Sequence, residues 1–171
     1  MSSPFNDMDE IIPNLYLGNI ASSKNTAKLK ELGIKKILSV IESNAPSYKK
    51  EDNFNHKVIS VYDTVRENIV QYFGECLNFI KGEEKVLVHC MAGASRSAAV
   101  VIAYIMWSQK KELYEIYNLV KEKRSMIFPN PGFKYQLQLF ENELKKYDYD
   151  INKIKFDEIK VEQKSYGCFW D

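Results

Sequence analysis

The stretch that decides the fold is residues 85–97, which read KVLVHCMAGASRS. Residues 86–88 are apolar throughout, as is typical of a central strand covered on both faces, and residues 97–109 form a helical pattern that is apolar nearly all round. The residues between them therefore form a short loop from the end of a strand to the start of a helix. Backbone N–H groups converge in such a loop and the helix dipole adds its positive end, so it suits a phosphate-sized dianion.

The loop also carries a nucleophile and a cation. The field of the loop favours the thiolate of Cys90, which is the nucleophilic form of cysteine. Arg96 offers a planar fork that matches two phosphate oxygens, and Gly93 stands where a loop around a phosphate needs a positive φ. The pattern predicts cysteine-based hydrolysis of a phosphate ester; the alternative is a buried cysteine followed by an unrelated arginine.

Strand and helix patterns alternate along the chain, which indicates an α/β fold with a largely parallel sheet. The predicted strands are residues 15–17, 34–41, 57–62 and 85–90. The predicted helices are residues 25–32, 69–81, 97–109, 114–123 and 132–147. Residues 42–55 are polar and are expected to form a surface loop.

Residues 89–97 resemble the signature loop of the protein tyrosine phosphatase superfamily, in its dual-specificity branch. Further motifs of that branch follow in the same order, namely IPNLYLG at 12–18, LGIKKILSV at 32–40, Arg124, and PNPGF at 129–133 with Gln136-Leu137. The resemblance covers about residues 10–145 and implies the fold of that family, a central, mostly parallel sheet of about five strands flanked by helices. We expect an N-terminal segment (1–9), a catalytic domain (10–147) and a C-terminal extension of unknown role (148–171).

The resemblance implies a role for each matching residue. Cys90 attacks phosphorus and forms a phosphocysteine, while Asp63 protonates the leaving oxygen and later activates water. Ser97 eases departure of the sulfur. The phosphate is bound by Met91, Ala92, Gly93, Ala94, Ser95 and Arg96, and the loop is supported by His89 and Asn130.

Several of these residues have a second interpretation. Asp63 could cap the next helix or form an Asx turn, with Glu67 as the next candidate for the acid. Ser97 could be a plain hydroxyl at a helix start, and Asn130 before Pro131 could be a helix cap as well as a brace for the loop. Arg124 could contact the sheet, contact a loop or face solvent.

The variable loop positions carry no basic residue, which suits one phosphate on a peptide better than a substrate with several phosphates. By resemblance we expect a stand-alone dual-specificity protein phosphatase that hydrolyses phosphotyrosine and phosphoserine or phosphothreonine in phosphorylated proteins. One alternative is a phosphopeptide-binding module with little turnover. Another is a phosphatase for a phospholipid, a glucan or a nucleotide.

Composition narrows the class of protein further. The 171 residues suffice for one domain, and the net charge of +1 gives no reason to expect nucleic-acid or membrane binding. With two histidines and no ligand spacing, we expect no metal and no cofactor. We expect a monomer in the cytoplasm, with the nucleus also possible, that acts in signalling.

The three cysteines are odd in number and no secretion signal precedes them, which argues for a reducing compartment without a disulfide framework. Cys76 lies in a helical pattern and is expected to be core packing, and Cys168 near the C-terminus is expected to be free. Either could instead act as a resolving thiol if Cys90 is oxidised.

Overall fold

The computed structural model describes residues 6–162. The strands are β1 (Met8–Ile12), β2 (Leu15–Gly18), β3 (Ile34–Val40), β4 (Asn55–Ile59) and β5 (Lys85–His89). The helices are α1 (Ile20–Lys24), α2 (Thr26–Leu32), α3 (Phe73–Ile80), α4 (Arg96–Gln109), α5 (Leu113–Lys123) and α6 (Pro131–Lys146). Short 3₁₀ turns occur at η1 (Lys50–Asp52), η2 (Val70–Tyr72), η3 (Ile151–Lys153) and η4 (Phe156–Glu158).

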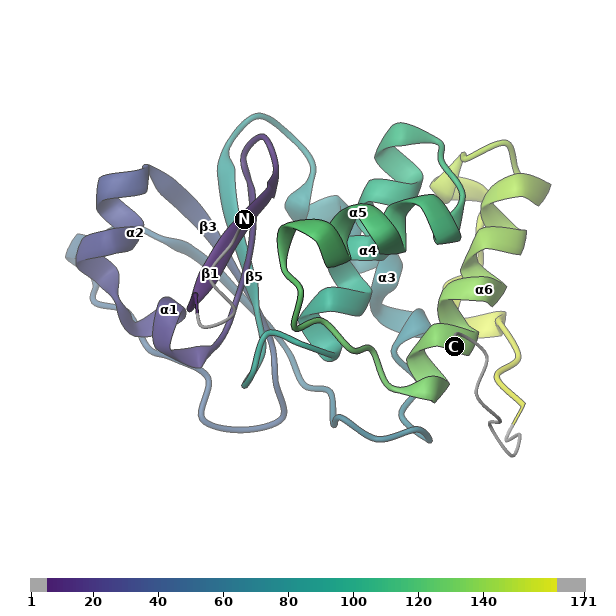
Figure 1. The fold of residues 1–171 in the computed structure, drawn as a ribbon, viewed down its shortest axis with the longest axis horizontal. Coiled ribbons are helices and arrows are strands. Elements are labelled where there is room, and N and C mark those ends of the chain that lie inside the picture. The colour runs from purple at the N-terminus through teal and green to yellow at the C-terminus, as the bar shows by residue number, and fades with distance from the viewer. Residues whose placement is uncertain (1–5, 163–171) are drawn as a thin grey trace.

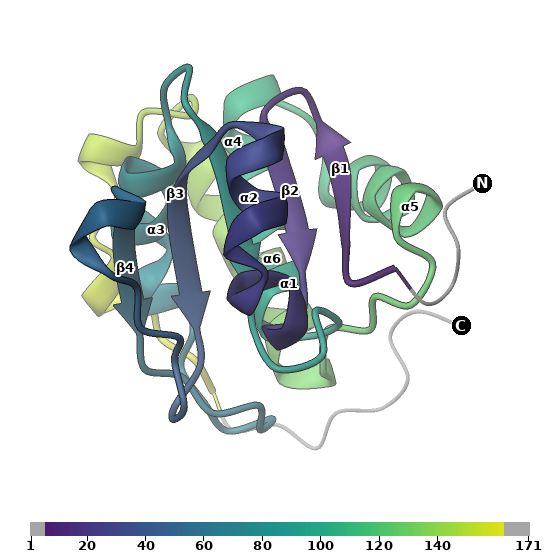
Figure 2. The same ribbon diagram turned by 90° about the vertical axis from the view of Figure 1, so that its left-hand side faces the viewer.

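The five strands form one sheet in the order β1-β2-β5-β3-β4, in which β1 pairs antiparallel with β2 and all other pairs are parallel. Helices α1 and α2 cover one face, and α3 to α6 cover the other (Figures 1 and 2). The predicted fold class, an α/β protein with a mostly parallel sheet of about five strands, is confirmed. Strand β5 lies at its centre, so the loop that follows it has a rigid base on both sides.

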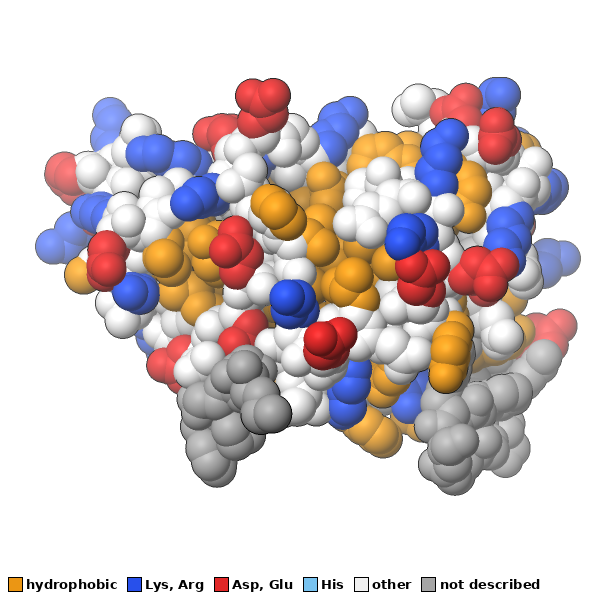
Figure 3. Space-filling view, turned by 45° about the horizontal axis from the view of Figure 1, so that its top comes forward, with side chains coloured by type: hydrophobic (Ala, Val, Ile, Leu, Met, Phe, Trp, Pro, Cys, Tyr) orange, Lys and Arg blue, Asp and Glu red, His pale blue; other side chains and the backbone are white. Residues whose placement is uncertain are grey.

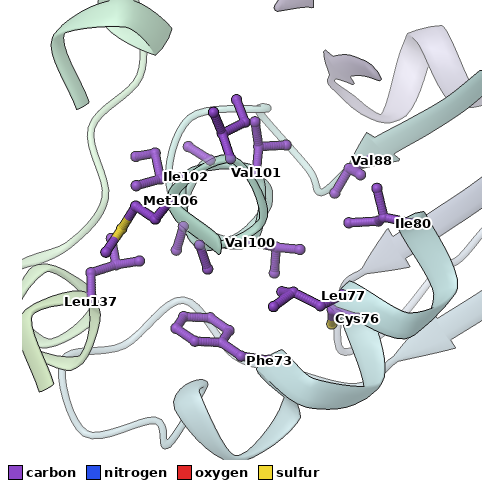
Figure 4. Close-up of a cluster of buried hydrophobic side chains, with 14 of the residues drawn as sticks. Phe73, Cys76, Leu77, Ile80, Val88, Val100, Val101, Ile102, Met106 and Leu137 are labelled. Carbon is purple, nitrogen blue, oxygen red and sulfur yellow. The ribbon is translucent and has the colours of Figure 1, made fainter. Parts of the chain in front are cut away.

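The apolar run of β5 divides between two cores, as a central strand requires. Val86 and Val88 belong to the large core under α3 to α6, whereas Leu87 belongs to the small core under α2. Helix α4 crosses the large core and is surrounded by side chains of α3, α6 and β5 (Figure 4). Burial on nearly every side explains why this helix is apolar all round.

The structure corrects several of the sequence-based element assignments. Strand β4 ends at Ile59 rather than at residue 62, so Asp63 lies four residues beyond the sheet. The helix predicted at 69–81 begins with the 3₁₀ turn η2, the surface loop 42–55 contains the turn η1, and α4 begins at Arg96, one residue before Ser97.

Two elements, β1 and α1, were not predicted. Helix α1 has five residues, too few for a periodic pattern, and depends on the Asn19 side chain, which accepts from the Ser22 N–H at 2.9 Å. Strand β1 lies at the edge of the sheet with a register shift between Glu10 and Ile12, so its sequence does not alternate.

The first part of the C-terminal extension packs on the domain. Ile151 and Ile154 are buried in the large core. Phe156 contacts the ring of Phe140 at a centroid distance of 5.8 Å, and it lies so close to α3 that a Cβ on Gly74 would meet its ring at 2.7 Å. Residues 148–162 therefore belong to the folded unit, whereas the predicted free Cys168 lies outside the described residues.

We expect the Phe156→Ala substitution to lower the free energy of unfolding by about 2 kcal/mol, less than the roughly 3–5 kcal/mol of a core phenylalanine because the ring is only partly buried. Urea denaturation measures the change. The exposed neighbour Asp157→Ala is the matched control and should stay near wild type. Equal stability of the two variants would contradict the packing role of the extension.

Candidate active site

The loop between β5 and α4 places the sulfur of Cys90 among donors. Cys90 is 2% exposed, and its Sγ lies 3.0 Å from Ser97 Oγ and 3.3 Å from the Gly93 N–H, which donates to it. A thiolate can only accept, so Ser97 would donate to it as well. The structure thus brings the predicted nucleophile and the predicted helix-start hydroxyl into contact.

The carbonyl oxygens of this loop are bound from outside, one after another. Cys90 O lies 3.0 Å from His89 Nδ1, and Met91 O accepts from the Ile20 N–H at 3.0 Å. Arg124 donates to Ala92 O at 3.4 Å and to Gly93 O at 2.9 Å. Ala94 O accepts from the Phe128 N–H at 2.7 Å. Five successive carbonyl groups therefore have fixed partners.

This arrangement directs the backbone N–H groups of the loop. In a trans peptide the C=O of one residue and the N–H of the next point in opposite directions. Holding the carbonyls of residues 90–94 outward thus turns the N–H groups of residues 91–95 the other way, and the Gly93 N–H on the sulfur shows that direction. A row of convergent N–H groups is an anion-binding cradle.

Gly93 has φ 67°, as expected from the sequence. A Cβ at this position would also lie 2.5 Å from Gly18 O at the end of β2. Both the backbone conformation and the close approach of β2 therefore require glycine.

Arg96 is buried and held at one end. Its Nη1 donates to Val61 O at 3.0 Å and forms an ion pair with Glu42. Its Nε is buried and has no hydrogen-bond partner within residues 6–162, so an N–H of the fork is free for a phosphate oxygen.

Glu42 was not predicted as a site residue. The Glu42 N–H and the Arg96 guanidinium hold the pKa of the Glu42 carboxyl below its usual value, although partial burial opposes this. One feature of the sequence could have pointed to Glu42, because it follows the carboxyl end of the parallel strand β3. The carboxyl ends of parallel strands lie at one edge of the sheet, which is where the loop after β5 also begins.

Asp63 lies beside the loop and is tied to it. Its Oδ1 accepts from Ser95 Oγ at 2.7 Å and from Asn130 Nδ2 at 2.9 Å, and the Asn130 N–H in turn donates to Ser95 Oγ at 3.0 Å. Asn130 also caps α6, since its side chain accepts from the Phe133 N–H at 3.0 Å. Asn130 therefore makes both contacts that the sequence left open.

The segment after Asp63 is held against α6. The side chain of Glu67, the second candidate for the acid, accepts a hydrogen bond from the Tyr62 N–H at 3.1 Å. This bond holds the two ends of residues 62–67 together. A Cβ on Gly132 would lie 2.2 Å from Val65 O, which shows how closely the segment packs on the start of α6. The contacts thus place Asp63 rather than Glu67 at the signature loop.

Arg124 contacts both the signature loop and strand β1 of the sheet, so of its three sequence interpretations only exposure to solvent is wrong. It is 1% exposed and, besides its bonds to the loop, donates to Asp9 Oδ2 and to Asn6 O, both at 2.8 Å. The Asp9 carboxylate balances the buried charge, so Arg124 can join the loop to the N-terminal strand.

His89 is fully buried directly before the nucleophile. Its Nε2 lies 2.6 Å from Ser39 Oγ on the neighbouring strand β3. Burial lowers the pKa of His89 to about 4, so the ring is neutral at pH 7 and supplies hydrogen bonds rather than charge.

Cys76 lies in the large core on α3, where burial raises the pKa of its thiol to about 12. The thiolate is therefore suppressed, which disfavours a role as a resolving thiol. Within residues 6–162 no group of three His, Cys, Asp or Glu side chains is arranged to hold a metal ion.

The pKa of His89 predicts a loss of stability at mildly acidic pH. In the unfolded chain an imidazole has a pKa of about 6.5, whereas in the fold it is about 4. Between these values the unfolded state binds more protons, so the free energy of unfolding should fall by ~2 kcal/mol from pH 7 to pH 5 because of this residue. Urea denaturation at each pH measures it. His89→Asn should have a shallower dependence; an unchanged slope would contradict the assignment.

The comparisons with known proteins agree with this geometry. Residues 15–143 match the family model described as dual specificity phosphatase, catalytic domain. The chain is 40% identical over 140 residues to human dual specificity protein phosphatase 9, covering 80% of this chain but 36% of that protein. It is 38% identical over 142 residues to dual specificity protein phosphatase 1B of Arabidopsis thaliana, covering 81% of this chain and 84% of that protein.

Solved structures show the same fold. The human tyrosine phosphatase-like serine/threonine/tyrosine-interacting protein aligns with a TM-score of 0.75 and 37% identity over 81% of this chain and 97% of that chain. A mouse putative dual specificity phosphatase complexed with zinc tungstate aligns with a TM-score of 0.78 and 26% identity, over 86% of this chain and 93% of that chain. Together with the geometry of the loop, the family match over most of the chain shows that this protein belongs to the dual specificity phosphatase catalytic domain family.

Proposed function

We propose that this domain hydrolyses phosphotyrosine and phosphoserine or phosphothreonine in proteins through a phosphocysteine intermediate. The observation that carries the proposal is the sulfur of Cys90, which contacts Ser97 and the Gly93 N–H inside a loop whose carbonyls are all bound from outside. A structural neighbour was solved in complex with zinc tungstate, whose anion is tetrahedral like phosphate, and this supports anion binding by a domain of this fold.

In the first step the Cys90 thiolate attacks phosphorus in line, so that an S–P bond forms as the P–O bond to the leaving group breaks. The N–H groups of residues 91–95 and Arg96 bind the three phosphoryl oxygens, whose charge they stabilise in the transition state. Asp63 gives its proton to the leaving oxygen. Because two donors bond its Oδ1, the proton is assigned to Oδ2.

In the second step water attacks the phosphocysteine. Asp63, now a carboxylate, takes a proton from the water, the new P–O bond forms and the S–P bond breaks. The hydrogen bond from Ser97 stabilises the departing thiolate. Each group thus ends in its starting state, and inorganic phosphate is the product.

A binding module with little turnover is the weaker alternative. One structural neighbour is named an interacting protein, and its 37% identity leaves room for that role. This chain, however, combines Cys90, Arg96 and Asp63 around one loop, and a binding module needs neither the nucleophile nor the acid.

The surroundings of the loop support a protein substrate rather than a phospholipid, a glucan or a nucleotide. Five of the seven large apolar side chains that are exposed within residues 6–162 come from the segments next to the signature loop; they are Tyr62, Val65, Met91, Met126 and Phe128. Two of these segments are joined to the loop by the Phe128 N–H on Ala94 O and by Asp63 on Ser95. Such a rim suits the apolar residues that flank a phosphorylated side chain.

We further propose a signalling phosphatase that acts as a monomer in the cytoplasm or the nucleus, with 10–147 as the catalytic domain and residues 148–162 packed on it. Positive and negative side chains alternate on the face drawn in Figure 3 and form no patch of one sign, which gives no electrostatic reason for nucleic-acid binding. No helix in residues 6–162 has the length and apolar character needed to cross a membrane.

Hydrolysis of matched phosphotyrosine and phosphothreonine peptides tests the proposal. The wild-type protein should cleave both. Cys90→Ser should lose nearly all activity because the nucleophile is removed, and Asp63→Asn should lose about 10²-fold or more because no acid protonates the leaving group. Phosphate release measures each rate.

Asp157→Ala serves as the unaffected control in the same assay. Tight binding of one phosphopeptide to the wild-type protein with negligible release of phosphate would favour the binding module over the enzyme. Release from lipid or nucleotide substrates but from neither peptide would overturn the substrate class.

Arg124→Lys should lower kcat/KM by about 10–100-fold. This is less than the effect of removing all the donors to the phosphoryl oxygens, but far more than the effect of substituting an exposed residue. A lysine can keep the ion pair with Asp9, but its single ammonium cannot also hold the carbonyls of Ala92 and Gly93. The exposed neighbour Lys123→Arg is the control. Equal kcat/KM for the two variants would show that the outward bonds from Arg124 do not matter.

A further inference from the structure

Both histidines of the chain lie in one row of hydrogen bonds that ends at the nucleophile. His56 Nε2 lies 2.8 Å from Ser39 Oγ, Ser39 Oγ lies 2.6 Å from His89 Nε2, and His89 Nδ1 lies 3.0 Å from Cys90 O. Ser39 and His89 are 0% exposed, whereas His56 is partly exposed. The row therefore runs from the outer strand β4 through β3 to the end of β5.

The sheet register explains why these side chains meet. Ser39 is the register partner of His89 across the β3–β5 pair, so the two side chains share one face. On the other side His56 is the partner of Ile37, and it reaches Ser39 two residues further along the same face of β3. Ser39 thus has an imidazole on each side and one proton to give.

The protons of this row have one arrangement that satisfies every group. A carbonyl only accepts, so His89 carries its proton on Nδ1 and donates to Cys90 O. Its ring is neutral at pH 7, so its Nε2 is an acceptor and takes the Ser39 proton. The Ser39 oxygen must then accept, and the donor is the Nε2–H of His56.

The direction of this row matters for the cradle. Its last bond holds the Cys90 carbonyl outward, and the same peptide turns the Met91 N–H toward the anion. Were His89 in the other tautomer, the lone pair of Nδ1 would face the carbonyl oxygen at 3.0 Å, and the carbonyl would lose its donor. The tautomer of His89 is therefore part of the cradle.

We propose that His56 is a positioning residue, which acts through Ser39 to hold His89 in the Nδ1–H tautomer that orients the signature loop. His56 touches neither the loop nor the sulfur, and its effect passes through a single hydroxyl. The proposal concerns how the proposed phosphatase site is organised, and its first test does not depend on activity.

The surroundings of His56 have room for other side chains at this position. It lines an open cavity of about 310 Å³ together with Tyr48, Lys49, Lys50, Asn53 and Phe54. The Tyr48 ring packs edge-on against the imidazole at a centroid distance of 4.9 Å. His56→Phe keeps an aromatic ring for this contact and removes the donor, whereas His56→Gln places an amide N–H near the position of Nε2–H.

The first test is the nitrogen NMR spectrum of the wild-type protein at pH 7, in which two imidazole rings give two resolvable sets of signals. The proposal requires one ring protonated on Nδ1 and the other on Nε2, both neutral. Two rings in the same tautomer would overturn it without any variant having to fold, and whatever the protein hydrolyses.

The second test is a double-mutant cycle of His56→Phe and Ser39→Ala, read by kcat/KM for an aryl phosphate and by the inhibition constant of inorganic vanadate. In each single variant kcat/KM should fall, and the inhibition constant of vanadate should rise, by about fivefold to tenfold. This is smaller than the effect of deleting a hydrogen-bond donor to the transition state. Because His56 acts only through Ser39, His56→Phe should add nothing in the Ser39→Ala background, and His56→Gln should restore most of the loss.

A general loss of strand packing would give a different result. The two substitutions would then add, and His56→Gln would be no better than His56→Phe. Either outcome would overturn the positioning role. The wild-type protein could also lack phosphatase activity but show the two tautomers and the same non-additive effect of the two substitutions on vanadate binding. That result would contradict the proposed reaction but support the positioning role of His56.

Discussion

The site depends on one constraint, the outward binding of five successive carbonyl groups in the loop of residues 90–94. A flexible loop would turn its N–H groups to water and to itself, and would have to reorganise at each turnover. Here the partners of the carbonyls are fixed by the fold. The anion cradle is therefore present before any phosphate arrives, which is what electrostatic preorganisation requires.

The rest of the architecture brings these partners to one place. Helix α1 supplies the Ile20 N–H, the segment between α5 and α6 supplies Arg124 and Phe128, and β5 supplies His89. Strand β1 holds Asp9 against Arg124, and the large core fixes α4, from which Arg96 and Ser97 project. Elements distant in sequence thus hold the loop in one conformation, and the ion pair with Glu42 fixes the guanidinium of Arg96 beside it.

Local patterns were enough to predict the strand–loop–helix unit, because an apolar run covered on both faces and an apolar helix leave few alternatives for residues 85–109. The positive φ of Gly93 followed from its place in the loop. Glu42, Ser39 and His56 could not be found this way, since each acts through a contact between strands or loops that is far away in sequence. The contact of Arg124 with the loop, one of three open interpretations, likewise depends on tertiary packing.

An NMR titration of the ¹⁵N-labelled protein with inorganic tungstate would test the outward-bound loop most directly. The account predicts that the amide protons of residues 91–95 all move downfield together at one saturating tungstate concentration, since each donates to the same anion. Movement of the Gly93 amide alone, with its neighbours unchanged, would contradict it. The cradle would then not be built from the outward-held carbonyls.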